Sequence, residues 1–201
     1  MRKPLALLAA ACFLFLGGSL AHVPHALANR YSDRGGRDGA SGRYSVVFGL
    51  DQALPNRHLT PGALNPAVTQ GNIRETICVR GYSKSIRPPE KYTEVLKRRG
   101  IHQYRYSDFR LRDYEEDHLV SLELGGSPTS PRNLWPQPHH VIGGWGSYAK
   151  DRLEDRLHTL VCRDRLPLEE AQHAIATDWI AAYKRYVGPA PVPGRHHRRV
   201  D

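Results

Sequence analysis

The C-terminal third of the chain has apolar residues at the spacing of one face of a helix. Between residues 146 and 162 the apolar positions are Leu153, Leu157, Leu160 and Val161, with charged residues between them. A second stripe comprises Ala171, Ile175, Trp179, Ala182 and Tyr186. Ser147 can start the first helix, and Pro167 and Gly188 frame the second. The pattern predicts two helices, which we expect to pack as a hairpin.

The preceding half of the chain is rich in loops. Residues 54–72 carry three prolines and two glycines. A short strand is predicted around residues 77–79, and a helix is predicted over residues 90–100, opened by Pro88-Pro89 and ended by Gly100.

Between these regions, the pattern predicts two strands joined by a loop. Residues 113–120 (DYEEDHLV) form the first strand and residues 133–138 (NLWPQP) the second, while Gly125-Gly126 permits a tight reversal between them. With the helix that follows from about Ser147, the chain is predicted to be an α+β protein. Residues 45–187 suffice for one domain, and we find no internal repeat in them.

The two ends of the chain differ from this domain in composition. Residues 1–28 begin with two basic residues, continue with an apolar run from Leu5 to Leu20 and finish in small residues, which indicates a secretory signal peptide. A retained membrane anchor is the alternative, but glycines and a serine interrupt the run. We expect residues 29–44 to be a flexible leader and residues 188–201 a disordered basic tail. The protein is therefore expected to be secreted or held in the cell envelope, without stable membrane insertion after cleavage.

The net charge of the chain narrows the class of partner. The formal net charge is +9, and removal of residues 1–28 would lower it to +7, because Arg2 and Lys3 would be lost. Such a balance favours a polyanionic partner, although a merely solubilising charge is an alternative.

Two cysteines, Cys78 and Cys162, would remain after removal of residues 1–28. An even pair in an exported chain predicts a disulfide that stabilises the fold by about 4–5 kcal/mol in the chain-entropy model. Two buried free thiols are the alternative.

Candidate chemistry lies in residues 117–136. Three segments there, Asp117-His118-Leu119-Val120, Glu123-Leu124-Gly125-Gly126 and Asn133-Leu134-Trp135-Pro136, resemble the motif of the HNH endonuclease, or ββα-metal, family. The span from about residue 60 to residue 186 resembles small exported bacterial proteins with that domain.

The resemblance implies a role for each residue. His118 would be the general base that deprotonates water, since a neutral imidazole suits that task. Asp117 would bind a divalent metal ion, Mg²⁺ in the first place, with Mn²⁺ or Zn²⁺ as alternatives. Asn133 would either bind the metal or hold the loop and the His118 ring. In that family the Asp-His pair sits where the strand bends, so we predict a bulge or irregular backbone at 117–118.

The chain departs from the family pattern in the helix after the second strand. The family commonly presents a last His, Asn or acidic residue from the first turns of that helix, but residues 146–151 contain no histidine. Asp151 or Glu154 could complete the metal shell, and His139 or His140 could reach it from the preceding loop. The sequence leaves these alternatives open.

Arginines near the motif offer contacts to phosphate groups, which position a nucleic acid without reading its bases. They are Arg105, Arg110, Arg112 and Arg132. The leading hypothesis is an exported, metal-dependent endonuclease of low sequence selectivity, with DNA as its substrate and RNA as an alternative. A non-catalytic nucleic-acid or polyanion-binding protein that retains the HNH fold is the second hypothesis, and a cell-envelope structural protein is the third. The oligomeric state is left open.

Overall fold

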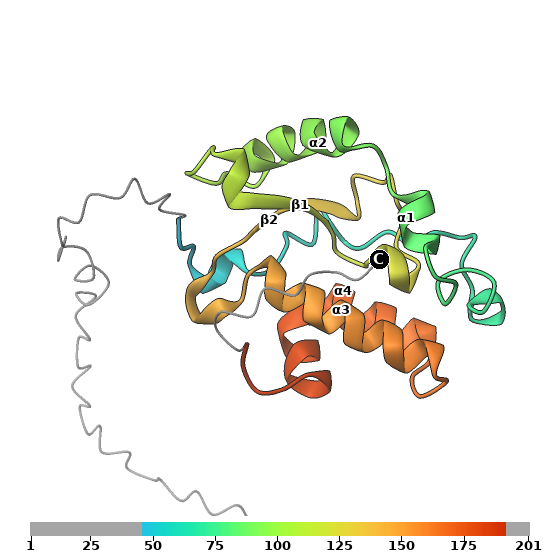
Figure 1. Cartoon of the computed structure of the whole chain (residues 1–201). Coiled ribbons are helices and arrows are strands. Elements are labelled where there is room, and N and C mark those ends of the chain that lie inside the picture. Colours follow the sequence, from blue (N-terminus) through green and yellow to red (C-terminus); the bar gives the residue numbers. More distant parts are fainter. Residues whose placement is uncertain (1–45, 192–201) are drawn as a thin grey trace, which may run out of the picture. The chain divides into compact units, whose positions relative to one another are not determined.

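The computed structural model describes residues 46–191, and these residues form an α+β fold (Figure 1). The chain divides into two units, Met1–Gly42 and Arg43–Asp201, and the described residues all belong to the second. The predicted signal peptide, the leader up to residue 44 and the tail from residue 192 lie outside the described residues. Within residues 46–191, no helix is both long enough and apolar enough to cross a membrane.

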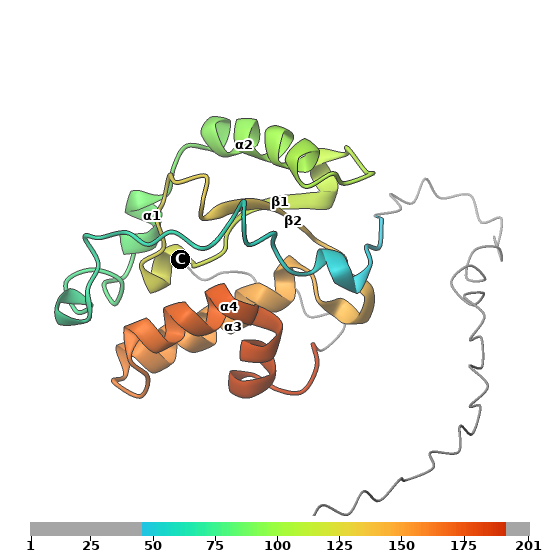
Figure 2. The same cartoon turned by 180° about the vertical axis from the view of Figure 1, so that it is seen from behind.

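A small antiparallel hairpin lies between two helical layers. Strands β1 (Tyr114–His118) and β2 (Leu134–Pro138) pair with each other. Helix α2 (Glu90–Gln103) lies on one side of the hairpin, next to the short helix α1 (Tyr82–Ile86). Helices α3 (Ser147–Cys162) and α4 (Leu168–Tyr186) lie side by side on the other, as Figures 1 and 2 both show.

The register of the hairpin is regular from end to end. Tyr114 lies opposite Pro138, and each following residue of β1 takes the next partner until His118 lies opposite Leu134. The ladder continues one step further, because the Leu119 backbone N–H donates to the Asn133 carbonyl at 2.8 Å. The bulge predicted at 117–118 is therefore wrong, and the chain bends at Leu119 and Val120.

The two prolines of β2 fit this ladder. Pro136 and Pro138 lie opposite Glu116 and Tyr114, two residues apart on the same side of the strand. The hydrogen-bonded positions are the odd-numbered ones, as the bond between Leu119 and Asn133 indicates. Neither proline therefore lies at a position where the ladder needs a backbone N–H donor.

The predicted reversal at the double glycine is confirmed. A single 3-10 turn, Leu122–Leu124, ends at Gly125, whose φ of 74° lies in the left-handed region. A Cβ on Gly126 would lie 1.7 Å from the Val120 carbonyl oxygen, so only glycine fits there. The two glycines bring the loop back toward the start of β2.

Helix α2 continues past the glycine that we expected to end it. Gly100 is buried inside the helix, and a Cβ at this position would lie 2.8 Å from Cδ of Pro136. The missing side chain lets α2 approach β2 closely. Gly100 is thus a contact residue rather than a helix terminator, and the helix ends at Gln103.

The strand predicted around residues 77–79 is wrong, because those residues form turns. The Cys78 N–H donates to the Ile73 carbonyl and the Val79 N–H to the Thr76 carbonyl, so the backbone bonds are local. The predicted disulfide between Cys78 and Cys162 is confirmed, and it ties these turns to the end of α3.

The two C-terminal helices supply much of the core. Leu153, Leu157 and Val161 of α3 are fully buried, as their spacing predicted. Helix α4 is interrupted at Asp178 (φ −159°, ψ 93°), whose carboxylate accepts the Ala181 N–H at 2.9 Å and so caps the following turns. Beyond this break, Tyr183 is fully buried while Tyr186 is only partly buried, because the change in direction rotates the last turns.

The close approach at Gly126 makes a stability prediction. Gly126→Ala should lower the free energy of unfolding by at least about 3 kcal/mol, since the new Cβ would overlap a backbone carbonyl and displace the loop. Urea unfolding followed by tryptophan fluorescence measures this. Gly71→Ala is the matched control, because the nearest atom there is 3.8 Å away and the change should cost little. Equal stability of both variants would contradict the loop geometry.

Candidate active site

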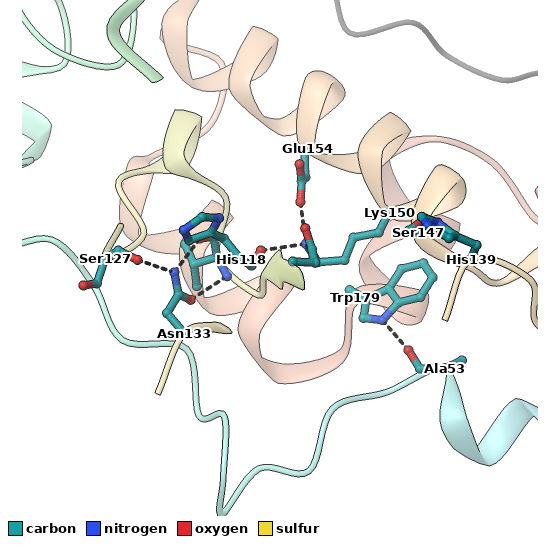
Figure 3. Close-up of polar contacts among 11 residues, drawn as sticks. Ala53, His118, Ser127, Asn133, His139, Ser147, Lys150, Glu154 and Trp179 are labelled. Carbon is teal, nitrogen blue, oxygen red and sulfur yellow. Dashed lines mark hydrogen bonds and ion pairs between the residues drawn. The ribbon is translucent and has the colours of Figure 1, made fainter. Parts of the chain in front are cut away.

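Asp117 and His118 end strand β1, and their side chains leave the hairpin in different directions. Consecutive residues of a regular strand point to opposite faces. The Asp117 carboxylate contacts Lys150 of α3, whereas the His118 ring contacts the Pro128 carbonyl in the loop between the strands. In Figure 3 the His118 ring lies on the side of Ser127 and Asn133, while Lys150 approaches from the opposite side.

His118 is held in one tautomer. Its Nε2 lies 2.9 Å from the Pro128 carbonyl oxygen, which can only accept, so Nε2 carries the hydrogen and Nδ1 keeps a lone pair. Burial lowers the pKa of His118 to about 4, and the positive charges of Arg87 and Lys150 act in the same direction. The ring is therefore neutral at ordinary pH.

Asn133 fastens the loop that carries these contacts. Its Oδ1 accepts the Val120 N–H at 2.9 Å, and its Nδ2 donates to the carbonyls of Val120 and Ser127 at 3.0 Å each. The side chain is completely buried. Of the two roles that the resemblance implied for Asn133, the structure matches holding the loop, because the amide already engages three backbone groups (Figure 3).

Lys150 is the site residue that sequence reasoning missed. Its ammonium contacts the carboxylates of Asp117, at 2.6 Å, and Glu154, and it donates to the His118 carbonyl at 2.8 Å. Only 1% of the side chain is exposed. A signal was available, since Lys150 precedes Leu153 and Leu157 by three and seven residues and so falls on the buried stripe of α3.

The charges of this cluster support one another. Burial alone would lower the pKa of Lys150, but the charges of Asp117 and Glu154 raise it above the ordinary lysine value. Lys150 is therefore charged. An ion pair this deeply buried ties the end of β1 to the first turns of α3, because removing one partner would leave an uncompensated charge.

The acidic and histidine residues predicted as metal ligands lie in different surroundings. Asp117 and Glu154 are both engaged by Lys150. Asp151 is buried in the second turn of α3, and His140 is half-buried in the loop before it. The neighbouring His139 stacks on Tyr148, and its Nδ1 lies 2.8 Å from the Ser147 hydroxyl.

One group of three potential metal ligands lies close together in residues 46–191, and it is elsewhere. The donor atoms of Cys78, His158 and Cys162 lie within 4.8 Å of one another, so the three residues could hold a metal ion. The two sulfurs are joined in the disulfide, however, and the thiolate is the form of cysteine that binds metals. This group could act as a three-ligand site only after reduction.

The four predicted phosphate-binding arginines are all exposed, but they differ in their contacts. Arg110 pairs with Asp108 and Asp113 at 2.9 Å, so part of its charge is neutralised. Arg132 lines a cavity of about 190 Å³ next to α2. Arg105 and Arg112 are exposed. The arginine whose charge acts on His118 is Arg87, at the end of α1, which the sequence reasoning did not select.

Comparisons with protein-family models, with curated proteins and with solved structures found no match to this chain. The function of this chain is therefore inferred from the residues of the motif and from the contacts that they make.

The bonds of Asn133 make the second prediction. Asn133→Asp should lower the free energy of unfolding by about 3 kcal/mol or more, because a carboxylate cannot donate to the two buried carbonyls. Urea unfolding provides the measurement. In the control Asn65→Asp, the exposed side chain keeps its role as acceptor of the Ala67 N–H, and stability should change little. A stable Asn133→Asp variant would show that the loop does not depend on these bonds.

Proposed function

We propose that this protein is an exported endonuclease of the HNH type, which hydrolyses phosphodiester bonds of DNA, or alternatively RNA, with low sequence selectivity. The observation that carries the proposal is the bond from Nε2 of His118 to the Pro128 carbonyl. It fixes a neutral imidazole with a lone pair on Nδ1 at the end of β1, in the strand–loop–strand–helix order that the motif predicted.

His118 is suited to the role of general base. Hydrolysis of a phosphodiester requires a water molecule to lose a proton as it attacks phosphorus. Nδ1 of His118 can take that proton, because the ring is neutral and its other nitrogen is already committed to Pro128. The loop that presents Pro128 is held by Asn133, whose role in this scheme is to position the base rather than to react.

Positive charge for the phosphate group is available near the base. Arg87 is exposed at the end of α1 and is close enough to His118 to lower the pKa of its ring. A guanidinium can bind two phosphate oxygens at once and oppose the charge that develops on them. Arg87 therefore joins the four arginines chosen from sequence as a candidate contact to the phosphate groups.

The divalent metal implied by the resemblance does not fit the site as it stands. Asp117 was to be its first ligand and Glu154 a further one, yet both carboxylates are bound to the Lys150 ammonium. Asn133 is committed to the loop backbone. We accordingly derive no step of the reaction through a metal ion.

A second candidate function is binding of nucleic acid or another polyanion without cleavage. The buried ion cluster of Lys150 favours it, because a carboxylate neutralised by an ammonium is withdrawn from metal chemistry. This candidate differs from the first in one respect, since binding would survive the loss of His118.

The third prediction separates the two functions. The full-length protein should nick supercoiled plasmid, and His118→Ala should reduce the rate at least about 100-fold, because general base catalysis contributes at least that much. The conversion of supercoiled to open circular DNA is measured on agarose gels. His173→Ala, which changes an exposed histidine of α4, is the matched control and should nick at the wild-type rate.

Binding is measured in parallel by electrophoretic mobility shift of a short DNA duplex. Equal binding by the wild type and His118→Ala, with no nicking by either, would reject the endonuclease and leave the binding function. Loss of nicking in His118→Ala alone, with binding retained, would support the endonuclease.

A further inference from the structure

The ammonium group of Lys150 is surrounded as a metal ion would be. Its three neighbours are all oxygen atoms, from the carboxylate of Asp117, the carboxylate of Glu154 and the carbonyl of His118. Two carboxylates and a carbonyl are a donor set that Mg²⁺, Ca²⁺ or Mn²⁺ would accept. The oxygens come from β1 and α3, the two elements that would have to share an ion in this motif.

The ammonium makes two hydrogen bonds, to the His118 carbonyl and the Glu154 carboxylate, and an ion pair with Asp117 at 2.6 Å. Its charge is thus matched by two carboxylates and a carbonyl. The side chain is 1% exposed, so no water shell accompanies it. The cluster is thus a completed site for a monovalent cation.

A divalent ion that bound these same oxygens would have to displace this ammonium. Asp117 and Glu154 would have to release Lys150, which would remain charged and buried beside the incoming ion. An unpaired buried charge is strongly unfavourable, and repulsion between the two cations would add to that cost. Lys150 and a divalent ion therefore compete for the same oxygens.

The position of Lys150 in the sequence also indicates that its ammonium takes the place of a metal ion. The family resemblance led us to expect a metal ligand from the first turns of the helix after the second strand. The fourth residue of α3 reaches that place, but it brings a cation in place of a ligand.

We propose that Lys150 is the built-in cation of this site, and that its ammonium excludes divalent metal ions from Asp117 and Glu154 in the folded protein. The proposal rests on the same site as the proposed function but not on its activity. It extends that function by assigning a protein group to the position that the resemblance gave to a metal cofactor.

The test is Mn²⁺ binding by the full-length protein, followed by the electron paramagnetic resonance signal of the free ion. The wild type should not lower the free-ion signal by binding Mn²⁺ at Asp117 and Glu154. Lys150→Met, which keeps an unbranched side chain one atom shorter and removes its charge, should bind Mn²⁺ at least about tenfold more tightly than the wild type. The double variant Lys150→Met/Asp117→Asn should lose that gain. Lys91→Met, an exposed position on α2, is the matched control and should behave as the wild type.

Two results would overturn the proposal. One is Mn²⁺ binding by the wild type that Asp117→Asn abolishes, and this measurement decides the matter even if Lys150→Met does not fold. The other is a folded Lys150→Met variant that binds no more Mn²⁺ than the wild type, because the oxygens would then not form a cation site. A plasmid that stays intact would reject the endonuclease without changing either result, so the two proposals can fail separately.

Discussion

The buried ion cluster around Lys150 fixes how the hairpin meets the helix that follows it. The hairpin has only two strands, and such a hairpin is marginal by itself. Its end is secured because the ammonium binds both the side chain of Asp117 and the backbone carbonyl of His118. Loss of one partner would leave a buried charge unpaired, at a large cost in free energy. The position of β1 relative to α3 therefore follows from electrostatics as well as from apolar packing.

The orientation of His118 depends on a second set of buried polar contacts. Asn133 binds the loop at two points, Val120 and Ser127, and Gly126 allows the loop to pass close to Val120. Pro128 directly follows Ser127, so its carbonyl is placed by the same clamp and can accept from the His118 ring. The reactive group of the proposed function is therefore positioned by residues that do no chemistry themselves.

The sequence predicted the elements of this arrangement better than their contacts. Periodicity identified the stripe of α3, and the double glycine identified the reversal, because both are local properties of the chain. Gly100 was misread as a helix end, since its purpose depends on Pro136, which is distant in sequence. Lys150 was not predicted as a site residue for a similar reason. A lysine in a helix is usually solvated, and only the approach of Asp117 makes this one a partner in a buried cluster.

Helix α3 brings these separate constraints together. Near its start Lys150 binds the end of β1, and at its last residue Cys162 is joined to Cys78 among the turns of the first half. Between them, Leu153 and Leu157 pack in the core. A helix held covalently at one end, by charge at the other and by apolar contacts between has little freedom to shift, so it can keep the end of β1, and with it His118, in one place. That rigidity would suit the general base of the proposed function, because its lone pair would have to meet a water molecule in a single geometry.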